Sequence, residues 1–169
     1  MKNKKLLLGI AWAWLTCLSA NAEVKLPAFF SDGMVMQQQT RANLWGTATP
    51  DAPVKITTSW DKQTYKTTAD AKGAWKLALS TPSAGGPYTI TFDDGKLTEI
   101  RDILMGELWL CSGQSNMEMP MKGFKNQPVE NSNTDVMNSR NPQLRLFTVK
   151  RSSSFTPKTD VVGTWQEAV

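Results

Sequence analysis

The feature that most constrains the fold of this chain is a series of short runs of alternating apolar and polar residues between Glu23 and about Met105. In 54–58 and 88–92, for example, every second residue is apolar. Side chains of a strand point alternately to the two faces of a sheet, so this pattern predicts strands with one packed face and one solvated face. The predicted strands are 33–37, 41–47, 54–60, 63–69, 75–80, 88–92 and 97–104.

The segments between these runs are rich in Pro, Gly and Asp, which set the backbone angles of turns. They lie at 49–53, 70–73, 84–87 and 93–95. Several short strands at such regular spacing are typical of a small antiparallel sandwich. We therefore predict a β-sandwich domain over residues 23–105.

The pattern changes at Gly106. Residues 108–111 are continuously apolar, as in a strand of a parallel sheet that is buried on both faces. A short helix is predicted near 131–139, capped by Asn or Ser and with Val136 and Met137 facing inward, and a strand at 144–149. Residues 106–169 thus resemble the opening βαβ portion of an α/β domain, too short to form a closed core by themselves.

The first 22 residues have the pattern of a secretory signal peptide: an initial group of lysines, an apolar core over 6–15, and a small-residue site ending at Ala22. The core is well short of the roughly 20 residues that a membrane-spanning helix needs. We expect cleavage after Ala22, a secreted or periplasmic chain, and no stable membrane insertion. The alternatives are an uncleaved anchor or a lipoprotein modified at Cys17.

Charge and residue usage exclude several kinds of function. Loss of the signal peptide would remove three lysines and no acidic residue, which takes the formal net charge from +4 to +1. Such a chain has no field that would collect nucleic acid. Only Cys111 would remain, so no internal disulfide is expected, and the sequence contains no histidine to ligate a metal or act as a general base. No metal or organic cofactor is predicted, and no feature assigns an oligomeric state.

A polar turn at 112–116 follows the apolar run directly. A serine in this position, Ser115, would sit at the carboxyl edge of a sheet, where α/β folds place their sites. Gly113 allows a close turn, and backbone N–H groups nearby can face a developing oxyanion. On spacing alone, however, such a turn is more often structural than catalytic.

The stretch 106–120 resembles the nucleophile block of the sialate O-acetylesterase family of SGNH-type hydrolases, and its most specific part is Gly113-Gln114-Ser115-Asn116-Met117. Further segments resemble that family in its order; they are 30–37, 44–46, 73–75, 85–88 and 145–149. The resemblance implies a β-sandwich packed on an α/β esterase domain, an O-acetylated sugar as substrate, and no cofactor.

The resemblance also implies roles for individual residues. Ser115 would be the nucleophile, and its own N–H would form part of the oxyanion hole. Gln114 and Asn116 would shape the turn, while Glu118 would contact substrate or, as we favour, support the loop. The family's catalytic Asp and His are expected beyond Val169, so the chain by itself is expected to be inactive or nearly so.

Several residues have simpler interpretations that compete with a catalytic or binding role. A tryptophan within a strand pattern more often packs in the core than stacks on a sugar ring. A cysteine within an apolar run, such as Cys111, usually behaves as a small apolar residue. Asp102 and Asp135 are expected in turns or caps rather than as triad acids. The tryptophans concerned are Trp45, Trp60, Trp75 and Trp109.

Two alternatives to an esterase also remain. The first is a non-catalytic secreted glycan-binding or interaction module, and the second is a truncated product that does not fold stably.

Overall fold

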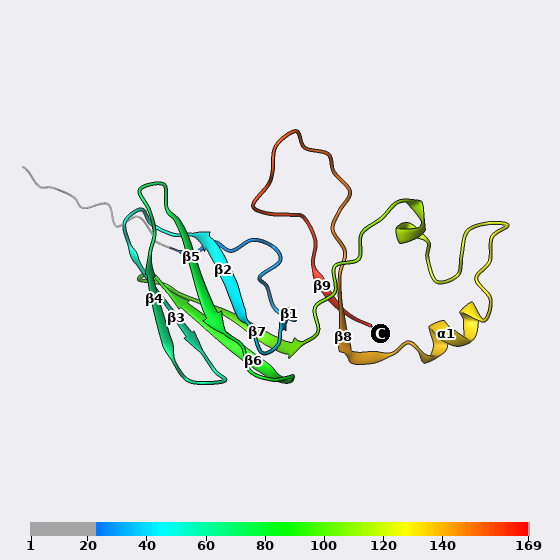
Figure 1. Cartoon of the computed structure of the whole chain (residues 1–169), viewed down its shortest axis with the longest axis horizontal. Helices are drawn as coiled ribbons and strands as arrows, with labels where there is room; N and C mark the ends of the chain where they lie inside the picture. Colours follow the sequence, from blue (N-terminus) through cyan, green and yellow to red (C-terminus); the bar gives the residue numbers. More distant parts are fainter. Residues whose placement is uncertain (1–22, 169) are drawn as a thin grey trace, which may run out of the picture.

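The computed structural model describes residues 23–168, so the predicted signal peptide lies outside the described residues. The described chain consists mainly of strands, with one α-helix and one 3-10 helix (Figure 1). The elements are β1 (Val35–Gln37), β2 (Arg41–Thr47), β3 (Pro53–Thr58), β4 (Thr64–Thr68), β5 (Ala74–Ser80), β6 (Gly85–Asp93), β7 (Leu97–Gly106), η1 (Ser115–Glu118), α1 (Ser132–Asn138), β8 (Asn141–Phe147) and β9 (Trp165–Ala168).

The first seven strands form a five-stranded mixed sheet in the order β1-β7-β6-β3-β4 and a two-stranded sheet of β2 and β5. Each strand predicted between residues 33 and 104 is present, with ends shifted by a few residues. The prediction that all pairs are antiparallel is wrong for β1 and β7, which run parallel. The reason is that the chain leaves β1 for the other sheet, so β1 has no hairpin partner and pairs with a strand far along the sequence.

Both sheets contribute side chains to one apolar core. In β3 the residues alternate between exposed and buried, with Val54, Ile56 and Thr58 inside, as the alternating pattern predicts. Leu44 of β2 and Phe92 of β6 are fully buried in the same cluster. All members of this core lie between residues 24 and 105.

β7 carries an irregularity that turns one of its side chains away from the sheet. Tyr88 pairs with Ile103 and Ile90 with Ile100, so β7 has one more residue than β6 over this stretch. Such an extra residue is a β-bulge, which bends a strand and re-aims a side chain. At the bulge Asp102 adopts a φ of 57°, and its carboxylate reaches Arg145 of β8 at 2.7 Å.

The region after β7 is more open, and its strands form a separate antiparallel hairpin of β8 and β9 (Figure 1). The predicted helix and the predicted strand near 144–149 are confirmed as α1 and β8, whereas the sequence pattern gives no sign of β9. The expectation that Val136 and Met137 face inward is wrong, because they are 41% and 82% exposed. Asn131 precedes α1, but its side chain makes no capping hydrogen bond.

The prediction of a buried strand at 108–111 is wrong for the described chain. Residues 107–114 belong to no strand, and Trp109 and Leu110 are 81% and 94% exposed. No described strand lies alongside this run to pair with it. The apolar pattern therefore indicates a requirement for burial that residues 23–168 do not meet.

The hairpin is attached to the sheets by one buried cation and by aromatic contacts. The Arg145 side chain is only 7% exposed and pairs with both Asp102 at 2.7 Å and Glu167 at 3.3 Å. Trp165 donates its indole N–H to the Phe29 carbonyl at 2.8 Å and packs on the Phe29 ring. Asp102 is therefore occupied by an ion pair, which argues against a role as a triad acid.

Candidate active site

The candidate nucleophile Ser115 is the first residue of η1, in a turn closed by backbone hydrogen bonds. The N–H of Met117 donates to the Gln114 carbonyl at 3.0 Å, and the N–H of Met119 donates to the Asn116 carbonyl at 3.3 Å. A Cβ added to Gly113 would lie 2.8 Å from Cγ of Met117, so a larger residue there would displace that side chain. The turn thus has a physical reason for glycine two residues before the serine.

The turn is exposed to solvent at Ser115, and no hydrogen bond joins the Ser115 hydroxyl to another residue between 23 and 168. A serine hydroxyl is a weak nucleophile until a neighbouring base takes its proton. The described residues place no such base beside it, and the whole sequence contains no histidine. The turn presents a hydroxyl without the group that would activate it.

Glu118 at the end of η1 forms an ion pair with Arg151, which follows β8. The two side chains are 54% and 79% exposed, and exposed pairs of this kind contribute little stability. The contact nevertheless connects the turn to the segment after β8. This geometry agrees with a loop-supporting role for Glu118.

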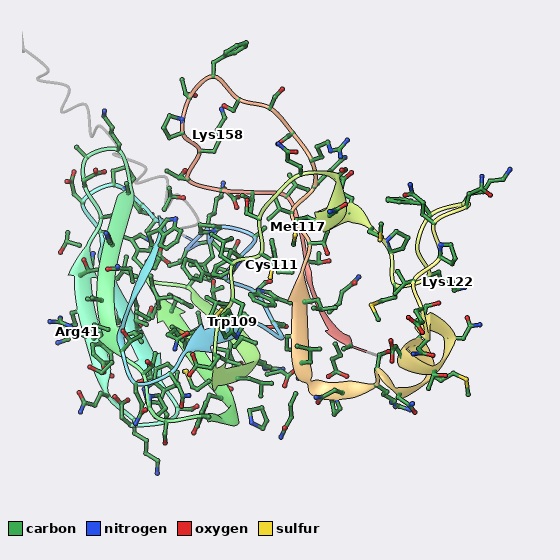
Figure 2. All side chains as sticks on the ribbon, turned by 45° about the vertical axis from the view of Figure 1, so that its right-hand side comes forward. Arg41, Trp109, Cys111, Met117, Lys122 and Lys158 are labelled. Carbon is green, nitrogen blue, oxygen red and sulfur yellow. The ribbon has the colours of Figure 1, made fainter. Side chains whose placement is uncertain are left out.

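An open hollow of about 1960 Å³ lies between the turn, the segment that leads to it and β8. Gly113, Gln114, Ser115 and Glu118 line this hollow, whereas Asn116 does not. Figure 2 shows Trp109 and Cys111 along the segment that connects β7 to the turn, and Met117 in the turn itself. The structure therefore brings four of the five predicted site residues to one concave surface.

The tryptophans divide between packing and exposure. Trp75 is 4% exposed and packs on Phe92 with ring centroids 5.9 Å apart, which confirms its predicted core position. Trp45 is half-buried, packs on Phe30, and donates its indole N–H to the Thr159 carbonyl at 3.1 Å. Trp109 is exposed, so the prediction that it belongs to a core is wrong for the described residues.

Cys111 is also exposed, contrary to the expectation that it lies on a buried strand. Cys111 is exposed for the same reason as its neighbours, because no described strand pairs with residues 108–111. Asp135 lies in the first turn of α1, as expected for a residue near a helix start. Neither residue lies in a group that resembles a triad.

Sequence reasoning missed a polar group at the start of the segment that leads to Ser115. Both oxygens of Glu107 accept hydrogen bonds from side-chain amides, one from Gln37 at 3.0 Å and one from Gln38 at 2.8 Å. These two donors hold the pKa of Glu107 below its ordinary value of 4.5. No spacing rule relates residues about 70 positions apart, so no local signal could have found this group.

Within residues 23–168 no group of three or more His, Cys, Asp or Glu side chains is arranged to hold a metal ion. In the same part of the chain, no helix has the length and apolar character needed to cross a membrane.

No family model matches the sequence. Curated proteins do match it. The chain is 30% identical over 155 residues to the sialate O-acetylesterase of Pongo abelii, an alignment that covers 86% of this chain and 29% of that protein. It is 32% identical over 131 residues to the sialate O-acetylesterase of Homo sapiens, covering 72% of this chain and 25% of that protein.

The chain belongs to the sialate O-acetylesterase family. A solved structure agrees: a carbohydrate acetylesterase from Xanthomonas citri superposes with a TM-score of 0.77 at 33% identity, over 86% of this chain and 33% of that one. The family resemblance predicted from the nucleophile block and the other matching segments is therefore confirmed. The chain spans about a quarter to a third of the length of these relatives.

Proposed function

We propose that this chain carries the nucleophile of a sialate O-acetylesterase-like carbohydrate esterase, which removes O-acetyl groups from sialic acid or related glycans. The observation that carries the proposal is the position of Ser115, at the exposed start of a tight turn on a large hollow, in a chain of this family. The named substrate class of the relatives supports the choice of an acetylated sugar.

The proposal assigns two domains to the mature chain. Residues 23–105 would be a β-sandwich domain, and 106–169 would be the start of an SGNH-type α/β esterase domain that these residues leave incomplete. In support, among residues 23–168 every residue of the buried core lies between 24 and 105, whereas all but one of the exposed large hydrophobic residues lie between 108 and 162. An apolar surface of this extent is usually covered by more polypeptide.

The chemistry would be acyl transfer in two steps. The Ser115 Oγ attacks the acetyl carbonyl, its proton passes to a general base, and the backbone N–H of Ser115 donates to the oxyanion. The sugar hydroxyl leaves with a proton, and water then attacks the acetyl-serine to release acetate. Gln114 and Asn116 would shape the turn, and Glu118 would hold it through Arg151.

The general base would have to come from polypeptide other than these 169 residues, because they contain no histidine and Asp102 is paired with Arg145. The 169 residues alone are therefore expected to be inactive. The reaction as drawn needs no metal or organic cofactor. We further expect export through a signal peptide cleaved after Ala22, to the periplasm or the exterior.

A non-catalytic glycan-binding or interaction module is the less favoured function, because the relatives are named as esterases.

The deciding experiment begins by reading the coding DNA beyond codon 169 and producing the natural protein that contains these residues. Acetate release from an O-acetylated sialic acid is then compared between the natural protein, Ser115→Ala and Ser80→Ala, at an exposed serine in β5 that does not line the hollow. We expect Ser115→Ala to lower kcat by roughly 10⁴-fold or more and Ser80→Ala to leave it unchanged. Full activity in Ser115→Ala would rule out Ser115 as the nucleophile.

A further inference from the structure

The ends of β1 and β7 lie side by side and are joined by an arrangement of polar side chains. Gln37 is the register partner of Gly106 in the parallel pair. The side-chain amides of Gln37 and of the next residue, Gln38, donate to the two carboxylate oxygens of Glu107, which follows Gly106, at 3.0 and 2.8 Å. One carboxylate is thus held at both oxygens by two residues that are adjacent in sequence.

The carbonyl ends of the same two amides are also used. The Gln37 Oε1 accepts the backbone N–H of Leu108 at 2.9 Å, and the Gln38 Oε1 accepts that of Ala84 at 2.7 Å. The backbone N–H of Gln38 donates to the Gly106 carbonyl at 2.9 Å. Residues 106–108 are therefore fixed to the turn after β1 by bonds whose donors and acceptors are all matched.

This group makes the last described hydrogen bonds of the chain before the turn that contains the candidate nucleophile. No backbone hydrogen bond joins residues 109–113 to any other described residue, and the next bonded turn begins at Gln114. The direction of residues 109–113 is consequently set where they leave β7. Figure 2 shows Trp109 and Cys111 on this segment, between the sheets and the turn that contains Met117.

We infer that Gln37, Gln38 and Glu107 form a polar clamp that fixes the direction in which the chain leaves β7 and thereby positions the segment that carries Ser115. These are positioning residues, since none of them touches the reacting atoms. The importance of the direction rests on the proposed function of Ser115, whereas the clamp itself rests only on the contacts above.

The matching of donors and acceptors gives the clamp a sharp test. In Glu107→Gln one carboxylate oxygen becomes an NH₂ group that faces the NH₂ of Gln37 or that of Gln38, so two donors meet. If the opposing glutamine turns its amide over, it presents a donor to the N–H of Leu108 (for Gln37) or of Ala84 (for Gln38) instead. Either way one hydrogen bond is lost. In the double variant Gln37→Glu with Glu107→Gln, the new carboxylate at position 37 accepts both from the new amide at position 107 and from the N–H of Leu108, and every bond is restored.

The experiment measures amide hydrogen exchange by NMR in the full chain. For Glu107→Gln we expect exchange of the Leu108 amide or of the Ala84 amide to rise about tenfold, according to which glutamine faces the new NH₂ group, which is the size expected for the loss of one hydrogen bond. The rate should return to that of the parent in the double variant. The control is Glu130→Gln, at an exposed acid outside the clamp, which should change nothing. Unchanged exchange in Glu107→Gln, or no recovery in the double variant, would overturn the clamp.

The positioning role is tested in the natural esterase that contains these residues. There Glu107→Gln should lower kcat with little change in KM, and the double variant should recover it. A clamp that passes the exchange test while kcat does not change would remove the positioning role. Activity that survives Ser115→Ala would instead contradict the proposed function and leave the exchange result standing.

Discussion

Replacing Arg145 with Met should weaken the attachment of the β8–β9 hairpin to the sheets. Met keeps most of the apolar stem but removes the guanidinium. That group donates to Asp102 at 2.7 and 3.3 Å, pairs with Glu167 at 3.3 Å, and donates to the Pro142 carbonyl at 3.0 Å. The substitution therefore separates a loss of charged contacts from a loss of packing.

The size of the effect follows from where the charges lie. The Arg145 side chain is 7% exposed, so its hydrogen bonds to charged partners fall in the range of about 1.5–3 kcal/mol. Asp102 and Glu167 are 45% and 43% exposed and regain water when the guanidinium is removed, which keeps the loss toward the lower end of that range. We expect a loss of about 2 kcal/mol, which lowers Tm by about 4–8 °C for a chain of this size.

Thermal unfolding followed by circular dichroism and by tryptophan fluorescence would measure this change, since Trp165 lies in the same hairpin. The matched control is Arg101→Met, because Arg101 pairs with Glu99 but is 72% exposed. Exposed pairs are screened by water and contribute little to stability, so Arg101→Met should shift Tm much less than Arg145→Met. Equal shifts for the two variants would refute the argument that burial of Arg145 makes its contacts strong.

Two further predictions concern the strand-rich region. Phe92→Ala removes a fully buried ring and should destabilise the chain by about 3–5 kcal/mol in urea unfolding, whereas Leu97→Ala, at a residue 70% exposed, should change it by less than about 0.5 kcal/mol. At Asp61 burial opposes ionisation, but hydrogen bonds from Thr58, the Gln63 N–H and Tyr65 outweigh it and lower the pKa below 3.8. This contribution is present above pH 3.8 and is lost as pH falls through the lowered pKa, so the stability gap between parent and Asp61→Asn should close in acid. A gap that stays constant down to about pH 2 would contradict the assignment of these hydrogen bonds to the ionised carboxylate.

The strands could be predicted because their signal is local. In β3 the alternation of Val54, Ile56 and Thr58 with polar residues matches the alternation of burial in the structure. The turn before β5 contains Gly73, which adopts a φ of 82° and packs against the Ala48 carbonyl, where a side chain would not fit. Each of these features is contained within a few residues, which is the range over which a sequence pattern carries information.

Features that depend on distant partners could not be predicted. The parallel pairing of β1 with β7 joins residues about 70 positions apart, and so does the contact of Gln37 with Glu107. The bulge at Asp102 has meaning only beside Arg145, 43 positions later. Nothing in the local sequence distinguishes this aspartate from an ordinary turn residue, because its partner is set by the register of the sheet.

The candidate site also combines a feature that a local sequence pattern predicts with one that depends on distant residues. A local motif predicts the turn around Ser115, and the backbone hydrogen bonds of that turn span only three residues. An equally local pattern predicts burial of 108–111, yet Leu110 is 94% exposed. An apolar run shows that a segment favours burial, but whether it is buried depends on the strands beside it, and residues 23–168 supply none.

The position of Ser115 therefore has a different physical basis from the fold of the strands. The core is complete between residues 24 and 105, and no residue of 107–118 belongs to it. The segment with the nucleophile is oriented by polar contacts instead, those of Glu107 at its start and that of Glu118 with Arg151 at its end. Because these contacts lie outside the core, single substitutions at Glu107 should change the orientation of the turn while leaving the unfolding transition of the strands almost unaltered. Loss of the strand-rich fold on replacing Glu107 would show that the two are not separable in this way.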